Sequence, residues 1–381
     1  MRQVPISTPR MEATVPAMLA DIETLVTCES PSADHAAVAR SADIVAGIGV
    51  KHLGVEPDRF VIDGWTHLRW RLGSTAARRV LVLGHHDTVW PNGSLATHPF
   101  TIDGGVLRGP GCLDMKAGLV MAFHAIGALR QVSGLTVLVT GDEELGSVSS
   151  RSLIEDEASQ CDAVLVLEAA ADGGALKTAR KGVSLYEVNV RGKAAHAGLE
   201  PDSGVNASIE LAHQILAIGG LADPVLGTTV TPTVMTAGTT TNTVPASGSV
   251  RVDVRTRMLA EQSRVDDRIR ALRPVLAGAE LEVTGGPNRP PMPAEASASL
   301  YARLCELAAG LGSPPPPSAA VGGGSDGNFT AGLGIPTLDG LGAVGGGPHA
   351  DDEHVVVAEL PRRTALLAAL LEDLLTRPAA G

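Results

Sequence analysis

Three short apolar runs in this chain end abruptly in histidine or acidic residues, and this pattern constrains the fold most. Residues 80–83 run into His85, residues 135–139 into Asp142-Glu143-Glu144, and residues 163–167 into Glu168. Such Val- and Leu-rich runs, alternating with helical segments, are typical of a buried parallel sheet in an α/β fold. Because ligands bind beyond the carboxyl ends of such strands, we expect the three polar groups to meet on one edge of the sheet.

The first of these strand ends carries the sequence His85-His86-Asp87. Residues two apart in a strand point to the same face, so Asp87 is placed to accept a hydrogen bond from the ring nitrogen of His85 that a metal leaves free. His86 points the other way and is predicted to be structural. A strand that merely passes into a solvated loop is the commoner explanation of a lone His-x-Asp pair, so a metal site needs further ligands from the other strand ends.

The bulk composition limits the function classes. A length of 381 residues exceeds the usual size of one core and predicts two domains. A net charge of -12 without a Lys/Arg block argues against nucleic acid and anionic membranes as partners. The 4 cysteines are far apart, without the spacing of a zinc ribbon or a disulfide framework. No signal peptide or transmembrane pattern is present, which predicts a cytoplasmic protein.

A change of pattern predicts an inserted domain over residues 181–287. The periodicity there reads strand, helix, strand, strand, helix, strand, over residues 184–190, 205–218, 228–235, 249–256, 259–272 and 280–284. This β-α-β-β-α-β order predicts a small ferredoxin-like α+β domain. It would interrupt a catalytic domain made of residues 1–180 and 288–381.

The side chains collected on the predicted sheet edge suit a metal centre. They are His85, Asp114, Glu144, Glu168 and, from a late glycine-rich loop, His349. Two imidazoles and three carboxylates suit Zn²⁺ or a similar ion, and they suffice for two ions if one carboxylate bridges. A pair of ions about 3.5–4 Å apart lowers the pKa of a shared water to roughly 7 and polarises a carbonyl, which predicts hydrolysis.

Adjacent Glu143 and Glu144 can divide two roles, because the attacking water needs a general base that stays off the metal. An acidic first turn of a helix is the alternative for such a cluster, and its position after a core strand weighs against it. The glycine runs at residues 322–324 and 345–347 lack the features of a nucleotide loop. They are interpreted as close backbone packing around a site.

Together these residues resemble the di-zinc metallopeptidase family that includes glutamate carboxypeptidase, aminoacylase and succinyl-diaminopimelate desuccinylase. The resemblance covers nearly the whole chain and is greatest to the glutamate carboxypeptidase branch. The motifs that carry it are GHHDTV at 84–89, GPGCLDMKAG at 109–118, TGDEELGS at 140–147, LVLEAA at 165–170, GKAAHAG at 192–198, GGGSD at 322–326 and GGPHADDEH at 346–354.

The resemblance implies two Zn²⁺ ions per chain, with Co²⁺ or Mn²⁺ as alternatives. Asp114 matches the ligand that bridges the two ions. One ion would be completed by His85 and Glu168, and the other by Glu144 and His349.

The same resemblance implies three further features of the site. Glu143 matches the general base, and Asp87 matches the residue that orients His85. The peptide bond between Asp114 and Met115 is implied to be cis, although Met115 is not a proline.

For the inserted segment, the resemblance implies a lid and dimerisation domain, and hence a homodimer. His196 matches a residue that reaches the partner subunit's active site and can stabilise a tetrahedral oxyanion. Asn242, Arg255 and Arg289 resemble positions that hold a substrate carboxylate, a task suited to the fork of a guanidinium group.

The resulting prediction is a metal-dependent hydrolase that cleaves the amide bond of small N-acyl or peptidyl amino acids bearing a free carboxylate. An alternative within enzymes is a deacylase or desuccinylase of a biosynthetic amino acid, with which GGGSDGNF at 322–329 is compatible. An alternative from another class is a catalytically silent carboxylate-binding homologue. Such a protein would have lost a ligand or the general base, and this chain has all of them.

Overall fold

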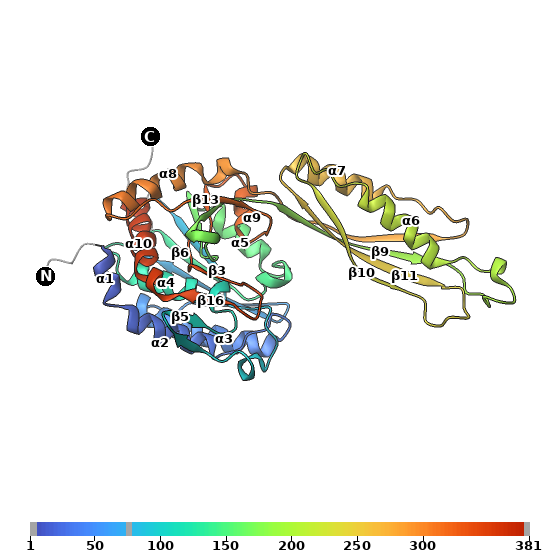
Figure 1. Cartoon of the computed structure of the whole chain (residues 1–381). Coiled ribbons are helices and arrows are strands. Elements are labelled where there is room, and N and C mark those ends of the chain that lie inside the picture. The colour runs from blue at the N-terminus through green and yellow to red at the C-terminus, as the bar shows by residue number, and fades with distance from the viewer. Residues whose placement is uncertain (1–5, 74–77, 377–381) are drawn as a thin grey trace. The chain divides into compact units, whose positions relative to one another are not determined.

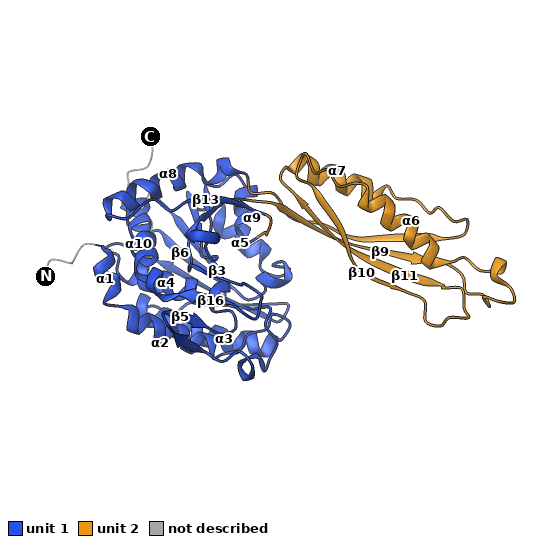
Figure 2. Cartoon of the chain, viewed as in Figure 1, with its two compact units in different colours: residues 1–179, 293–321, 325–381 blue, residues 180–292, 322–324 orange. Residues whose placement is uncertain are grey.

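Two units share the chain, and one of them interrupts the sequence of the other. The structure, a computed structural model, describes residues 6–73 and 78–376. The first unit draws on residues 1–179, 293–321 and 325–381, and the second on residues 180–292 and 322–324 (Figure 2).

A sheet that includes β3 and β6 forms the centre of the first unit (Figure 1). It has six strands, in the order β1-β2-β6-β3-β7-β14. Its strands are Asp58–Ile62 (β1), Trp65–Leu72 (β2), Leu135–Thr140 (β6), Val80–His85 (β3), Ala163–Val166 (β7) and Thr337–Leu338 (β14). β3 runs parallel to both β6 and β7, and β14 runs parallel to β7. β2 pairs antiparallel with β1 and β6.

Helices cover both faces of this sheet, which explains the continuous apolar runs of its strands. Val80 and Val82 of β3 belong to one core, which includes residues of α1 to α4, α8 and α10. Leu81 and Leu83 belong to a second core with residues of α5 and α9, because successive strand residues point to opposite faces. The helices are Thr8–Glu12 (α1), Val15–Val26 (α2), His35–Leu53 (α3), Ala117–Gly127 (α4), Arg151–Ala158 (α5), Ala294–Gly310 (α8), Gly327–Gly332 (α9) and Leu360–Thr376 (α10).

Two smaller sheets complete the first unit. One has the order β15-β16-β5-β4, with strands Gly345–Gly346 (β15), His354–Val356 (β16), Val106–Arg108 (β5) and Thr101–Asp103 (β4). It ties the segment that leads to Asp114 to the segment that carries His349. The other pairs Ser318–Val321 (β13) with Leu176–Arg180 (β8). Across the described ranges, no helix has both the length and the apolar character that a membrane crossing needs.

The second unit has the β-α-β-β-α-β order predicted from the sequence. Its elements are Gly182–Arg191 (β9), Ala207–Gly219 (α6), Thr229–Ala237 (β10), Ser247–Thr256 (β11), Leu259–Arg270 (α7) and Glu280–Arg289 (β12). The strands pair antiparallel in the ferredoxin-like order β10-β11-β9-β12, and α6 and α7 pack on one face (Figure 1). Alternate residues Tyr186, Val188 and Val190 of β9 enter the core beneath the helices. The predicted fold class is therefore confirmed.

Candidate metal centre and active site

The carboxyl ends of β6, β3 and β7 lie side by side, and the candidate site forms there. β3 ends at His85, while Glu144 and Glu168 come shortly after the ends of β6 and β7. Asp114 comes from the segment after β5, and His349 from the loop after β15. The structure brings all five predicted ligands into one cluster.

Asp114 lies between the two halves of this cluster. On one side, Nε2 of His85 is 3.3 Å from Oδ1 of Asp114 and 3.6 Å from Oε1 of Glu168. On the other side, Nε2 of His349 is 3.3 Å from Oδ2 of Asp114 and 3.2 Å from Oε1 of Glu144. Each carboxylate oxygen of Asp114 therefore faces a different histidine, which is the arrangement that a bridging ligand requires.

Three buried atoms of the cluster make no hydrogen bond within the described part of the chain: Nε2 of His85, Oδ1 of Asp114 and Oε1 of Glu144. A buried polar atom without a partner costs about 1–3 kcal/mol, and such atoms are rare. These atoms contact their neighbours without the alignment of a hydrogen bond, as ligands aimed at a common ion do. Imidazole nitrogens and carboxylate oxygens are the donors that Zn²⁺ takes in proteins, so the residues present fit a metal.

The pKa values in the cluster point the same way. Burial opposes ionisation of Asp114, but the rings of His349 and His85, each with a nitrogen 3.3 Å from one of its oxygens, outweigh it and hold the pKa of this carboxyl well below its usual range. Burial raises the pKa of Glu144, and the nearby charge of Asp114 adds to that rise. The carboxylates of Asp114 and Glu144 beside its ring raise the pKa of His349 to about 10. The negative charge of the clustered carboxylates thus stabilises the protonated form of His349, and the same environment favours the binding of a cation.

Asp87 contacts both His85 and the acidic loop after β6. Nδ1 of His85, the ring nitrogen away from the cluster, is 3.0 Å from the backbone oxygen of Asp87 and 3.4 Å from its Oδ1. The two carboxylate oxygens of Asp87 also accept the backbone N–H groups of Glu143 and Glu144, each at 3.2 Å. The hydroxyl of Ser32 donates to Oδ2 at 2.7 Å. The contact with the acidic loop was not evident from the sequence.

His86 points away from the cluster, as the strand register predicted. Its Nε2 lies 3.1 Å from the backbone oxygen of Thr66. Complete burial lowers the pKa of His86 to about 4, so the ring stays neutral at pH 7.

Glu143 stands beside the His85 half of the cluster. Its carboxylate and the ligand atoms of His85 and Glu168 all lie within 4.8 Å of one another. Glu143 is the first residue of a short helical turn, which Asp142 precedes. The carboxylate of Asp142 stabilises this turn by accepting hydrogen bonds from the backbone N–H groups of Ser149 at 2.7 Å and Ser150 at 3.2 Å. Glu144 contacts His349 at 3.2 Å, and its ligand atom also lies within 4.8 Å of those of His85 and Asp114.

Glu353 shapes the segment that carries Asp114, and the sequence analysis missed it. Its buried carboxylate accepts four N–H groups: those of Gly111 at 3.1 Å, Leu113 at 2.8 Å, Asp114 at 3.1 Å and the indole of Trp90 at 2.6 Å. The peptide bond between Asp114 and Met115 is cis, as the resemblance implied. The only sequence signal for Glu353 was its position in the GGPHADDEH motif.

The two glycine runs differ in what surrounds them. A Cβ on Gly345 would lie 1.8 Å from the backbone oxygen of His354, so the second run does pack closely. A Cβ on Gly322 would meet nothing within 4 Å, so the interpretation as close packing is wrong for that residue of the first run. In the first run, the guanidinium of Arg180 donates a hydrogen bond to the backbone oxygen of Gly323 at 3.0 Å.

His196 and Asn242 lie in the second unit, on exposed loops. Nδ1 of His196 accepts the N–H groups of Gly198 and Leu199, each at 3.1 Å. The backbone oxygen of Asn242 accepts the N–H of Ala197 at 2.9 Å, which ties the two loops together. The catalytic and binding roles of these residues stay predictions.

The two predicted arginines also belong to the second unit. Arg255 is half-buried and forms a double hydrogen bond with Asp253, at 2.8 and 2.7 Å. Arg289 is 6% exposed and contacts Asn288 at 3.2 Å. The guanidinium of Arg255 is thus already paired with a carboxylate, and that of Arg289 is buried.

A pocket of about 440 Å³ opens beside Asp114. Most of the residues that line it are small, and they come from residues 169–171, 319–321 and 345–348. Lys177 is the cation that lines it, with Nζ 4.0 Å from Oε2 of Glu168, and Asp172 adds an acid. A pocket with small walls and a few charged groups beside candidate ligands is suited to a small polar substrate.

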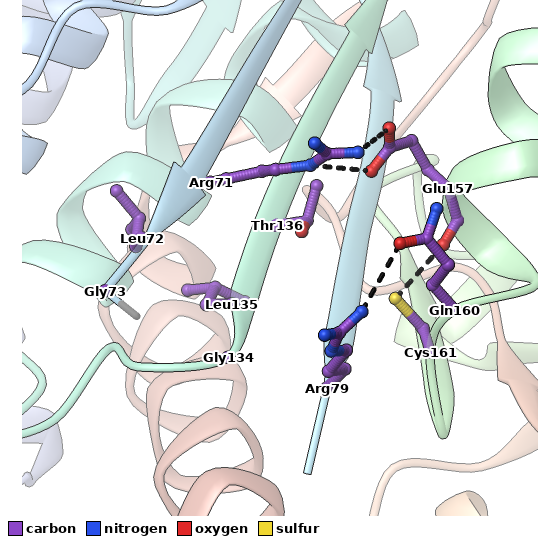
Figure 3. Close-up of a pocket in the computed structure, with 10 residues that line it drawn as sticks. All are labelled: Arg71, Leu72, Gly73, Arg79, Gly134, Leu135, Thr136, Glu157, Gln160 and Cys161. Atoms are coloured by element: carbon purple, nitrogen blue, oxygen red, sulfur yellow. Dashed lines mark hydrogen bonds and ion pairs between the residues drawn. The ribbon is translucent and has the colours of Figure 1, made fainter. Parts of the chain in front are cut away.

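A second hollow, of about 230 Å³, lies at the other end of the sheet, where β3 and β6 begin (Figure 3). Arg71 pairs there with Glu157 at 2.6 Å, and Arg79 donates to Gln160 at 3.3 Å. None of the predicted site residues lines this hollow, so it is not the candidate active site.

Residues 81–373 match the profile of the Peptidase family M20/M25/M40. This match covers more than half of the chain, and the chain belongs to this family. It is a metallopeptidase or amidohydrolase, so the family and the enzyme class predicted from the sequence are confirmed.

Individual relatives place the chain within this family. It is 31% identical over 375 residues to carboxypeptidase G2 of Pseudomonas sp. (strain RS-16), covering 94% of this chain and 89% of that protein. It is 29% identical over 333 residues to succinyl-diaminopimelate desuccinylase of Magnetococcus marinus, covering 80% and 85%. The structure of the M20 family metallo-carboxypeptidase Sso-CP2 from Sulfolobus solfataricus has a TM-score of 0.74 at 17% identity, over 94% of this chain and 98% of that one.

Proposed function

We propose that this enzyme hydrolyses the amide bond of N-acyl or peptidyl amino acids that carry a free carboxylate. The proposal rests on the position of Asp114. One of its carboxylate oxygens faces His85, which lies beside Glu168, and the other faces His349, which lies beside Glu144. The names of carboxypeptidase G2 and of the metallo-carboxypeptidase Sso-CP2 support a substrate with a free carboxylate.

We infer a site for two divalent ions, with Zn²⁺ expected and Co²⁺ or Mn²⁺ as alternatives. His85 and Glu168 would hold one ion, Glu144 and His349 the other, and Asp114 both. Two such ions, when bound, would lower the pKa of water to roughly 7 and polarise the substrate carbonyl.

Glu143 is the proposed general base. It would take a proton from the attacking water and pass it to the nitrogen of the leaving amine. Its side chain is only 9% exposed and lies beside His85 and Glu168, so few bulk waters compete for the proton. Asp87 would support this step by holding the backbone of Glu143 and the ring of His85.

The substrate carboxylate is proposed to bind to Asn242, Arg255 or Arg289 of the second unit. Arg255 would have to exchange its pair with Asp253 for the substrate. Lys177 offers a further positive charge in the pocket beside Asp114. In a homodimer, which the family resemblance implies, His196 would act in the partner subunit's site as an oxyanion donor.

A second candidate is a deacylase or desuccinylase of a biosynthetic amino acid. The pocket beside Asp114 favours it, because Lys177 and Asp172 place charges of both signs on its walls. Such walls suit a substrate part that carries an ammonium as well as a carboxylate. The match to a succinyl-diaminopimelate desuccinylase supports the same candidate.

Hydrolysis of a panel of substrates by the Zn²⁺-loaded chain tests these proposals. The panel varies the acyl group at constant glutamate, and then the amino acid at constant acyl group. If the hydrolysis rate depends mainly on the amino acid, the carboxypeptidase-like function is supported. If the rate depends mainly on the presence of a succinyl group, the second candidate is supported. No turnover on any member, with two ions bound, would favour the silent carboxylate-binding homologue.

The Glu143→Gln variant tests the mechanism. We expect it to retain its metal and to lose turnover by about 10²–10⁴-fold, the usual contribution of a general base. Glu56→Gln, a change at an exposed glutamate, is the matched control and should leave turnover unchanged. Equal activity of Glu143→Gln and the wild type would overturn the assignment.

A further inference from the structure

Away from the carboxyl ends of the strands, three helices of the first unit bring two histidines and a carboxylate together. Asp21 lies in α2, His52 in the last turn of α3 and His124 in the last turn of α4. Nε2 of His52 is 2.9 Å and Nε2 of His124 is 3.0 Å from the same oxygen, Oδ2 of Asp21. The two rings lie with centroids 4.1 Å apart and planes tilted by 46°. We call these three residues the helix cluster.

We propose that the helix cluster is a second, separate binding site for one divalent transition-metal ion, with Zn²⁺ as the fitting member of that class. Its three ligand atoms lie within 4.8 Å of one another, and two imidazoles with one carboxylate form a common three-ligand set. This site shares no residue with the cluster around Asp114.

The spacing of the ligand atoms is close to what such an ion requires. Metal bonds of about 2.0–2.2 Å in a tetrahedron separate neighbouring ligand atoms by roughly 3.3 Å. The present separations of 2.9 and 3.0 Å need to widen by only a few tenths of an ångström. Because the side chains come from three different helices, small rotamer changes suffice for this adjustment.

Burial and charge prepare these groups for a cation. Asp21 is 6% and His124 is 7% exposed, whereas the side chain of His52 is 15% exposed and leaves a path to solvent. Burial, with His52 adding to it, lowers the pKa of His124, so its ring is neutral near pH 7, the form that binds metals. Burial opposes ionisation of Asp21, but hydrogen bonds from Lys51, His52 and His124 hold its pKa below the usual range.

Lys51 leaves the ligand oxygen of Asp21 available. Its Nζ lies 2.6 Å from the other oxygen, Oδ1, and its side chain is 53% exposed. The ammonium therefore fixes the orientation of the carboxylate from outside and can move into water when a second cation arrives. A bound ion would link α2, α3 and α4, and α4 begins directly after the segment that carries Asp114.

Counting zinc ions on the full chain tests this proposal. Wild-type protein and the His52→Gln variant are equilibrated with buffered Zn²⁺, and zinc per chain is measured by mass spectrometry. We expect His52→Gln to bind one ion fewer than the wild type. His213→Gln, at an exposed histidine of α6, is the matched control and should bind the same number as the wild type. Equal zinc counts for His52→Gln and the wild type would overturn the proposal.

A second measurement separates this site from the one around Asp114. In a chain with His85→Ala and His349→Ala, one zinc ion should remain and should raise the melting temperature. Adding Asp21→Asn to that chain should abolish both the remaining ion and the shift in melting temperature. A double variant that folds but binds no zinc would show that the helix cluster is only a hydrogen-bonded contact between helices.

Discussion

Three predicted site residues of the first unit and two of the second are held in very different ways. In the first unit, His85, Asp87 and Glu168 are 1%, 0% and 6% exposed. In the second unit, His196 and Asn242 lie on exposed loops and are held mainly through backbone contacts. Buried, multiply bonded side chains keep one geometry, whereas exposed loops can adjust to a ligand. The comparison indicates that burial fixes His85, Asp87 and Glu168 in one arrangement, whereas His196 and Asn242 lie where they can adjust.

Replacing Asp114 should give the largest effect and tests the prearranged half of this comparison. Asp114→Asn keeps the size of the side chain and removes the charge shared by both histidine-carboxylate pairs. We expect loss of both ions of this cluster and turnover at background, measured as zinc per chain and as hydrolysis rate. A variant that keeps both ions would contradict the bridging role.

Replacing His196 probes the adaptable half. If it acts as an oxyanion donor, His196→Ala should lower kcat by about 10²–10³-fold. Because the side chain is exposed, the free energy of unfolding should stay within about 0.5 kcal/mol of the wild type. Lys193→Ala, at an exposed position nearby, is the control. Unchanged kcat in His196→Ala would confine the chemistry to the first unit.

Asp87→Asn should have a smaller effect, because Asp87 acts through His85 and the acidic loop. Residues that orient a metal ligand usually contribute about 10–100-fold to metal affinity or activity. We therefore expect zinc affinity, measured by competition with a chelator, to fall within that range. An unchanged affinity would mean that the backbone oxygen of Asp87, 3.0 Å from the ring nitrogen, suffices to orient His85.

A glutamate-to-glutamine substitution should lower the free energy of unfolding more at a buried position of the first unit than at an exposed position of the second. Glu353→Gln weakens four hydrogen bonds to a buried carboxylate, so urea unfolding should show a loss of about 1–3 kcal/mol. Glu200→Gln, at an exposed glutamate of the second unit, should change stability by less than about 0.5 kcal/mol. Similar losses for both variants would remove the contrast between a rigid and an adaptable unit.

Much of the fold could be predicted from the sequence, because periodicity reports burial directly. The apolar runs before His85, Asp142 and Glu168 became three adjacent strands, and their polar ends met on one edge as expected. The β-α-β-β-α-β order of the second unit was predicted from periodicity in the same way.

Contacts set by tertiary structure could not be predicted. The N–H groups that Glu353 and Asp87 accept come from backbone segments far away in the chain, and no local pattern reports the position of an N–H group. The ion pair between Arg255 and Asp253 could not be predicted either, because it depends on the rotamers of the two side chains. The helix cluster combines three residues from three helices without a sequence motif, so only the packing of those helices brings it together.

The ends of the second unit are joined to each other. Arg180 and Met292 exchange both backbone hydrogen bonds, at 2.9 and 3.0 Å. A chain cut at these two residues would leave ends that a short turn can reconnect, with little loop-closure entropy. The chain of the second unit thus leaves and re-enters the first unit at one point, and the path of the polypeptide that carries His85, Asp114 and His349 does not depend on the length of the insertion.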